Sequence, residues 1–270
     1  MQVIKNKKTK VIVVYLVIIV ALFVGILLTN TQAEKHETVK EMMRDAVLHD
    51  VNKISLFGFI DVNPGLISAI VITSILLITA LIIRIFVIPK FKFIPTSKFQ
   101  ILLEEMVGLF DNFAKQNSPH RNNFLGAYIF GAGMYIFFGT LFELLGLQAI
   151  TTMGHSITLP APLSDINGAI ALGCLSYSVI VFGGIRANGL KGLVHALKEF
   201  SMPLSMSFRL FGAMLSGVLV TELVYYYYRL SFVLPIIVAV LFTLLHATIQ
   251  TYVLVMLTAS TYGSATKPEE

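Results

Sequence analysis

One arginine stands inside an apolar segment near the end of the chain. Arg209 lies in a run that reaches from about residue 205 to 228. An arginine buried in hydrocarbon costs from about 2.5 to well over 10 kcal/mol, so it either snorkels or pairs with another helix as a structural residue, or it has a function. Small residues follow it in two small-xxx-small pairs, which are Gly212, Ala213, Ser216 and Gly217. Such pairs let another helix approach closely, and they fit either a partner helix or a neighbouring span of the same chain.

A helical hairpin places a glutamine beside this arginine. Two apolar runs meet at a tight turn near Leu230, and residues equally far from such a turn lie level in antiparallel helices, so Gln250 lies opposite Arg209. His246 is one turn from Gln250 on the same face, and Thr243 continues the stripe. Because unsatisfied polar groups in hydrocarbon are costly, the stripe indicates either the lining of a wet path or a structural network between helices.

Other polar residues stand in or beside the apolar segments: Glu143, Ser164, Asp165, Asn167 and Glu222. Glu222 is predicted to lie about 20 Å further along the helix than Arg209 and about 140° around it, which places it nearer the outside. The Ser164, Asp165 and Asn167 cluster fits a helix N-cap or the lining of an external entrance. Glu143 is a further costly acid within a span.

Enzyme chemistry has no support in this sequence. A phosphate-binding glycine loop with its lysine, a paired-histidine helix motif and a nucleophile elbow are all missing. The histidines are too scattered to indicate a compact metal site, and Cys174 sits in an apolar run as a small hydrophobe. We therefore expect no catalytic residues, no metal and no cofactor.

The composition explains where these residues must lie. The chain has 270 residues, of which 56% are hydrophobic and 13% charged, with a mean hydropathy of +0.81. An ordinary soluble domain is about 25% charged, and a membrane-spanning helix needs about 20 apolar residues. The prediction is an all-α polytopic membrane protein of about five or six spans that ends in a long helical hairpin.

Lysine and arginine placement predicts the topology, so the net charge of +5 does not indicate nucleic acid. Spans are expected at about residues 66–88, 124–147, 166–185, 205–228 and 232–258. The basic connections at residues 89–122 and 186–198 belong inside, while residues 148–165 carry no Lys or Arg and belong outside. Apolar side chains at helical spacing predict a surface helix from Leu103 to Phe113 and a second amphipathic stretch from Leu190 to Phe200.

The N-terminal segment has two interpretations. Residues 1–33 hold four lysines before an apolar run from Val11 to Leu28, and Thr31-Gln32-Ala33 is similar to a small-residue cleavage site. The segment is therefore either a retained span or a cleavable signal. Residues 34–270 are expected to form a single membrane-embedded domain, with a short surface helix at about residues 34–52.

The hairpin resembles subunit a of the F-type ATP synthase. The specific agreement is in residues 203–214, PLSMSFRLFGAM, and residues 249–258, IQTYVLVMLT. Weaker agreement covers residues 159–167 and 95–104, so the resemblance extends over about residues 60–262.

The resemblance implies an ion-channel stator subunit with two aqueous half-channels, which holds an essential arginine against a ring of c subunits. Arg209 takes that role, Gln250 matches the family's glutamine, and His246 and Glu222 are the candidate channel residues. Further implied partners are the peripheral-stalk b subunits, other synthase subunits and the lipid bilayer. The coupling ion is a proton or sodium, the location is a bacterial plasma membrane with the C-terminus cytoplasmic, and nucleotide chemistry occurs in other subunits.

Several positions depart from the family pattern. Ala213 replaces the usual asparagine, and Val218 stands where an acid or histidine is common. Glu222 and His246 lie about a turn beyond the usual channel pair. His195 replaces an acid that commonly precedes the arginine, and Glu143 replaces a frequent asparagine.

An ion-coupled secondary transporter is the competing interpretation, with Arg209 binding an anionic substrate. That class predicts broken helices and an internal repeat. A membrane-embedded transferase is a third possibility, and it requires a charged catalytic cluster.

Overall fold

The computed structural model describes residues 54–56, 59–95, 97–120, 122–150, 152, 156–226 and 234–268, with Val17, Val20 and Val24. It falls into two compact units, His49–Ser216 with Thr243–Glu270 and Met1–Leu48 with Gly217–Phe242. Apart from the three exposed helical valines, the predicted N-terminal segment and the surface helix at residues 34–52 lie outside the described residues. The division at residue 34 therefore stays a prediction.

Five helices in the described part are long and apolar enough to cross a membrane, which confirms the all-α polytopic class. They are α3 (Pro64–Ile82), continued to Lys90 by a π turn and a 3₁₀ turn, α5 (Asn123–Leu141), α6 (Ile166–Lys198), α7 (Ser201–Tyr226) and α8 (Leu234–Thr266). The start of α3 is fixed by Pro64 in its first turn and by Asn63, whose Oδ1 accepts a hydrogen bond from the Gly65 N–H at 2.8 Å. The predicted amphipathic helix is α4 (Lys98–Asn117).

Two short antiparallel hairpins lie in the connections, where only loops were expected. One joins β1 (Ile54–Leu56) to β2 (Phe59–Val62), and the other joins β3 (Gln148–Ile150) to β4 (Ser156–Thr158). A 3₁₀ turn at Phe142–Leu145 ends the α5 span, and another at Pro162–Ser164 leads into α6. Strands of three or four residues carry too little periodicity to be recognised in a sequence.

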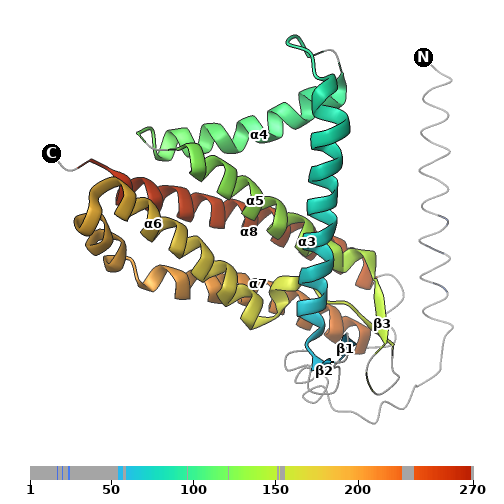
Figure 1. The fold of residues 1–270 in the computed structure, drawn as a ribbon. Helices are drawn as coiled ribbons and strands as arrows, with labels where there is room; N and C mark the ends of the chain where they lie inside the picture. The colour runs from blue at the N-terminus through green and yellow to red at the C-terminus, as the bar shows by residue number, and fades with distance from the viewer. Residues whose placement is uncertain are drawn as a thin grey trace. The chain divides into compact units, whose positions relative to one another are not determined.

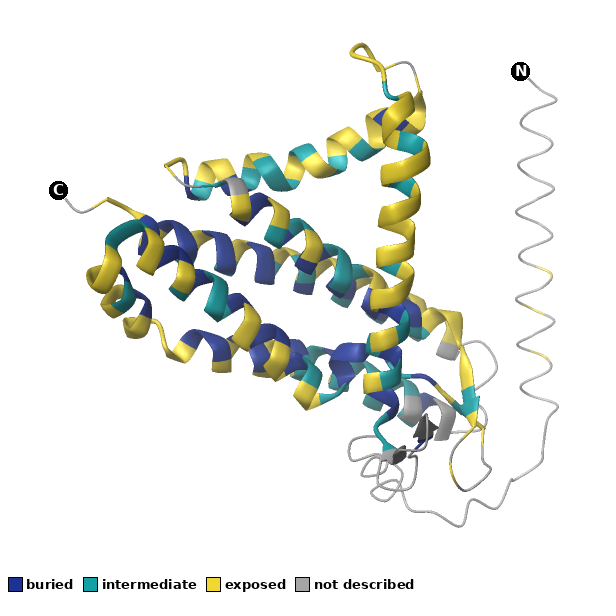
Figure 2. Ribbon diagram, in the orientation of Figure 1, coloured by how far each residue is buried: buried dark blue, intermediate teal, exposed yellow. Residues whose placement is uncertain are grey.

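The helices of the larger unit pack through one apolar core. Figure 1 shows α5 and α6 side by side with the parts of α7 and α8 that belong to this unit, while α3 crosses them steeply. The main core is formed by large buried residues of α5, α6, α7 and α8, among them Ile129, Ile136, Ile180, Met206, Leu210 and Leu254. The buried Ile72 of α3 belongs to a second, smaller cluster with Ile54, Phe142 and Leu159. The outward sides are exposed, as Figure 2 shows, and many of the exposed side chains are large and apolar. This is the surface that hydrocarbon covers in a membrane.

Glycines bring these helices into close contact. A Cβ on Gly173 in α6 would lie 2.9 Å from the Pro203 carbonyl oxygen of α7, and one on Gly133 in α5 would lie 2.8 Å from the Phe110 ring of α4. The Tyr128 hydroxyl of α5 also hydrogen-bonds the Ser176 hydroxyl of α6 at 2.7 Å. These contacts are typical of helix packing in membranes, where small residues and interhelical polar bonds replace the hydrophobic effect.

The prediction that residues 186–198 form a loop after a span ending near residue 185 is wrong. This segment is helical, and the chain turns back on itself at Gly189, whose φ of 60° and ψ of −133° are non-helical. The Tyr177 hydroxyl donates to the Ala196 carbonyl at 3.1 Å, although 19 residues of straight helix would span about 28 Å. The turn could not be predicted from the sequence, because a glycine adopts positive and negative φ about equally readily.

The turn-back also buries an unexpected side of the amphipathic stretch. Gly192 and Ala196 are buried, and a Cβ on Gly184 would lie 2.9 Å from the Gly192 carbonyl oxygen. Leu190, Val194, Leu197 and Phe200 are all exposed, by 81%, 56%, 50% and 62% respectively. The small residues therefore pack inward, and the large ones face outward.

The last span is also longer than expected, because α8 continues to Thr266 and not to about residue 258. Its final residues are held by side chains from elsewhere in the fold. The Asn188 amide donates to the Lys267 carbonyl at 2.7 Å, and His120 Nε2 lies 3.0 Å from the Thr266 hydroxyl oxygen. Tertiary contacts thus extend a helix through Ser260 to Thr266, a stretch whose polarity indicated a tail.

Replacing Gly189 by valine is expected to lower the free energy of unfolding by about 1–3 kcal/mol, because a β-branched residue is strained at positive φ. Thermal unfolding of the purified chain in detergent measures this loss. The matched control is Gly108→Val on α4, where a Cβ added to the glycine would meet nothing within 4 Å. Equal thermal stability of the two variants would contradict the turn-back at Gly189.

Candidate functional site

Arg209 lies on an exposed face of α7, two turns after the helix begins at Ser201. Ser205, Gly212 and Ser216 stand at helical spacing from it and are exposed as well. A Cβ added to Gly212 would meet nothing within 4 Å. The arginine is therefore flanked by small side chains on a face that the described part of the chain leaves open.

The structure brings Arg209 and Gln250 together at one small cavity. The cavity measures about 10 Å³ and is lined by Met206, Arg209, Leu210, Gln250, Val253, Leu254 and Leu257. A volume of about 10–15 Å³ is what one water molecule needs. Two polar side chains thus meet in an otherwise apolar surrounding, as the hairpin register predicted.

The side-chain oxygen of Gln250 accepts no hydrogen bond from the described residues. The residue is 6% exposed, and its Oε1 has no hydrogen-bond partner among the described residues. A buried amide oxygen left unpaired costs about 1–3 kcal/mol. The guanidinium of Arg209 carries donors only, so the two side chains are chemically complementary across the cavity.

The charge of Arg209 is not neutralised by the side chains that the structure describes. The ion pair found among them joins Lys115 to Asp111 at 2.6 Å on α4, and no carboxylate pairs with Arg209. An unpaired arginine on a hydrocarbon-facing surface is strongly disfavoured. Any anionic partner of Arg209 therefore lies outside the side chains that the structure describes.

The predicted polar stripe of α8 lies on its packed side. Thr243 and Gln250 are 8% and 6% exposed, and His246 is half-buried. Sequence reasoning missed Thr258, which is fully buried, has no partner for its hydroxyl among the described residues, and stands eight residues after Gln250. Two steps of four residues lead from Gln250 to Thr258 on one face of the helix, and this spacing was the signal that could have identified Thr258.

Glu222 belongs to the smaller unit, and the structure shows only that it lies in α7. Its side chain lies outside the described residues. Its distance from Arg209 and its place in a channel therefore stay predictions.

The Ser164, Asp165 and Asn167 cluster caps α6. Asp165 Oδ1 accepts hydrogen bonds from the Asn167 backbone N–H at 3.2 Å and from the Asn167 side-chain amide at 3.3 Å. The buried Ser164 hydroxyl donates to the Ala161 carbonyl at 2.7 Å. Capping accounts for these bonds, and a role in a channel is an additional hypothesis.

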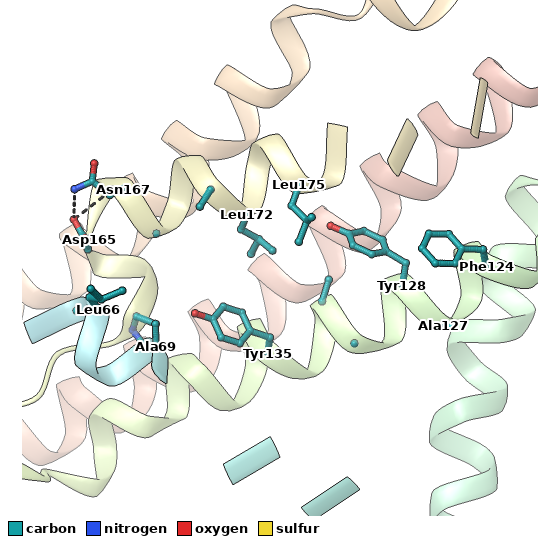
Figure 3. A pocket seen from close by; sticks show the side chains of 16 residues that line it. Leu66, Ala69, Phe124, Ala127, Tyr128, Tyr135, Asp165, Asn167, Leu172 and Leu175 are labelled. Atoms are coloured by element: carbon teal, nitrogen blue, oxygen red, sulfur yellow. Dashed lines mark hydrogen bonds between the residues drawn. The ribbon is translucent and has the colours of Figure 1, made fainter. Parts of the chain in front are cut away.

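Asp165 and Asn167 also stand at one end of a large cavity between α3, α5 and α6. The cavity measures about 980 Å³, and Figure 3 shows Tyr128, Tyr135 and Leu172 along it and Phe124 at its far end. Its walls are mostly apolar, with polar atoms from the cap at the Asp165 end. Glu143 is partly exposed in the 3₁₀ turn after α5 and lines neither this cavity nor the one at Arg209.

Within the described residues, no group of three or more His, Cys, Asp or Glu side chains comes together that could hold a metal ion.

Comparisons with known proteins match most of the chain. Residues 67–262 match the family model described as ATP synthase A chain. The ATP synthase subunit a of Sulfurihydrogenibium sp. (strain YO3AOP1) is 28% identical over 201 residues, which cover 68% of this chain and 89% of that protein. The ATP synthase subunit a of Histophilus somni (strain 2336) is 24% identical over 196 residues, which cover 60% and 74% respectively.

Cysteines that replace Arg209 and Gln250 are expected to crosslink with a short reagent, because both positions line one small cavity. The native Cys174 is first replaced by serine, and crosslinking is followed by digestion and mass spectrometry. The matched control pairs position 209 with Ser264→Cys, which lies about 21 Å beyond position 250 along α8. A stronger crosslink to position 264 than to position 250 would show that the register is wrong.

Proposed function

The chain belongs to the ATP synthase A chain family, and from this we propose that it is the stator subunit of a rotary F-type ATP synthase. In this proposal the chain provides two aqueous half-channels and faces a ring of c subunits. Peripheral-stalk b subunits hold it against that ring. The subunit is non-catalytic, and the nucleotide chemistry belongs to other subunits of the complex.

The observation that carries the proposal is the open, unneutralised arginine. Arg209 is exposed on α7 with small residues around it and has no carboxylate partner among the described side chains. A carboxylate on a helix of the ring supplies the missing anion. The small neighbours leave space for that helix to move past, as close approach in a membrane requires.

The electrostatics of this pairing couples ion release to rotation. A positive charge beside a carboxylate favours the ionised form and lowers its pKa, so a ring carboxylate must release its ion before it passes Arg209. The same positive charge repels a cation and prevents a direct leak between the half-channels. Each elementary charge that crosses 100 mV contributes about 2.3 kcal/mol to the rotation.

Gln250 acts in this scheme as the positioning group for the arginine. Its unpaired Oε1 and its place at the same cavity support a hydrogen bond from the guanidinium whenever the ring carboxylate is not engaged. Because the guanidinium donates in turn to the Gln250 amide and to the ring carboxylate, Arg209 stays at one level in the membrane. The half-buried His246, one turn away, then lies near the barrier between the half-channels.

The outer half-channel is proposed to use the remaining polar residues. Asp165 and Asn167 stand at the end of the 980 Å³ cavity, next to the buried Ser164 and the connection that lacks basic residues. Glu143 and Glu222 are the other acids expected on that side. With the C-terminus inside, Thr258 lies on the opposite side of the Arg209 level, about 12 Å from Gln250 along α8.

Arg209→Ala is expected to abolish coupled ATP synthesis in reconstituted vesicles while the complex still assembles, because a charge is lost and the core is untouched. Arg209→Lys should also fail largely, since an ammonium lacks the planar five-donor fork. The matched control is Arg84→Ala, which removes an exposed arginine at the end of α3 and should keep near-normal synthesis. Near-normal ion-driven synthesis by Arg209→Ala would refute the proposal.

Glu222→Gln should slow ion flux by less than about tenfold, because water can replace a carboxylate in a wet channel. His246→Ala should also slow ion flux, because it removes a polar group near the barrier between the half-channels. The two changes together are expected to act additively, as separated sites do. Strong non-additivity in flux measurements would show that Glu222 and His246 form a pair.

A further inference from the structure

The connection between α3 and α4 exposes both apolar and basic side chains at the end of a membrane span. Phe93 is 103% exposed and Ile94 is 74% exposed, which is unusual for large apolar residues in an ordered loop. Lys90, Lys92 and Lys98 around them are exposed too. Figure 1 shows this connection projecting beyond the ends of the two helices, and Figure 2 shows it as exposed.

The loop is held in this conformation by a buried side chain. Gln100, which is 3% exposed, donates from Nε2 to the Lys92 carbonyl at 2.7 Å and accepts from the Lys92 N–H at 3.3 Å. The same amide donates to Glu104 Oε1 at 2.7 Å. Pro89 and Pro95 restrict the backbone on either side. The hydrogen bonds of Gln100 and the two prolines thus hold Phe93 and Ile94 facing outward, away from the rest of the protein.

The loop between α3 and α4 itself carries charge of one sign, and the exposed Glu104 and Glu105 follow it in α4. Residues 62–103 contain Arg84, Lys90, Lys92 and Lys98 and no Asp or Glu. The exposed apolar surface continues from the last turns of α3, where Ile85 and Phe86 are 59% and 60% exposed. Lys90 and Lys92 alternate with Phe91 and Phe93 along the chain, so ammonium groups and apolar side chains lie together where the span ends. This combination matches the boundary between acyl chains and headgroups in a bilayer.

We propose that this loop is a binding site for anionic phospholipid, in which Phe93 and Ile94 enter the acyl region while Lys90, Lys92 and Lys98 hold lipid phosphates. Charge complementarity selects the occupant, because basic residues next to a span attract the anionic lipids of the cytoplasmic leaflet. The site lies at the opposite end of α3 from the cap of α6, and it does not depend on a ring or on ion flow. It would hold the start of α4 at a fixed depth in the membrane.

The test uses the full chain with a single tryptophan as a depth probe, since the native chain contains none. Phe93→Trp is reconstituted in vesicles of phosphatidylcholine with about 30 mol % phosphatidylglycerol, which gives a negative surface potential. Two samples are compared, and in each one lipid carries bromine on its acyl chains, which quenches tryptophan fluorescence. The brominated lipid is phosphatidylglycerol in the first sample and an equal amount of phosphatidylcholine in the second. Leu145→Trp, exposed in the 3₁₀ turn that ends the α5 span, is the matched control.

Quenching of Phe93→Trp is expected to be at least about twofold stronger with brominated phosphatidylglycerol, and the preference should fall at high salt. This preference for phosphatidylglycerol should disappear when Lys90→Gln, Lys92→Gln and Lys98→Gln are combined with Phe93→Trp. It should remain when Lys198→Gln and Lys267→Gln are combined with Phe93→Trp instead. Leu145→Trp should show no preference. Equal quenching by both lipids would overturn the proposal, because the loop would then enter the bilayer without selecting a headgroup. Lack of quenching by either would overturn it as well, because the loop would then face water or a protein.

Discussion

The fold is organised around one charge that hydrocarbon does not tolerate. Arg209 lies within a membrane-spanning helix, faces outward, and pairs with no carboxylate among the described side chains. The unfavourable free energy of such a group exceeds what one hydrogen bond offsets. In the proposed function, a carboxylate on a helix of the ring brings a negative charge to α7. On that proposal, the open face of α7 is the surface that the moving ring contacts.

The rest of the larger unit serves to hold this charge at a fixed place. Glycines at the α4–α5 and α6–α7 contacts let the helices pack at short range, and Tyr128 and Ser176 fasten α5 to α6. The turn at Gly189 folds the end of α6 back on itself just before α7 begins. In the proposed function, rigid packing behind the arginine holds the stator in place, and the small side chains beside it let the helices of the ring slide past.

The apolar runs and the basic loops were enough to predict the helices that span the membrane, because bilayer thickness fixes their length. The hairpin register also predicted that Arg209 and Gln250 meet, because antiparallel helices joined by a short turn pair equidistant residues. The turn at Gly189 and the extension of α8 to Thr266 were missed, since both depend on tertiary contacts. The two hairpins were missed because strands of three or four residues show too little periodicity. The large cavity between α3, α5 and α6 is formed by three helices distant in sequence, and no local pattern predicts it.

The claim that the open face of α7 meets a carboxylate-bearing helix is tested most directly by crosslinking in the intact complex. Cysteine replaces Gly212, which is exposed one turn from Arg209, and a second cysteine is placed next to the membrane carboxylate of the small ring-forming subunit. The account predicts a disulfide between them that forms on oxidation and stops rotation until it is reduced. Failure of position 212 to crosslink, while a cysteine at the outward-facing Leu175 of α6 does so, would show that the ring meets another face and would contradict the account.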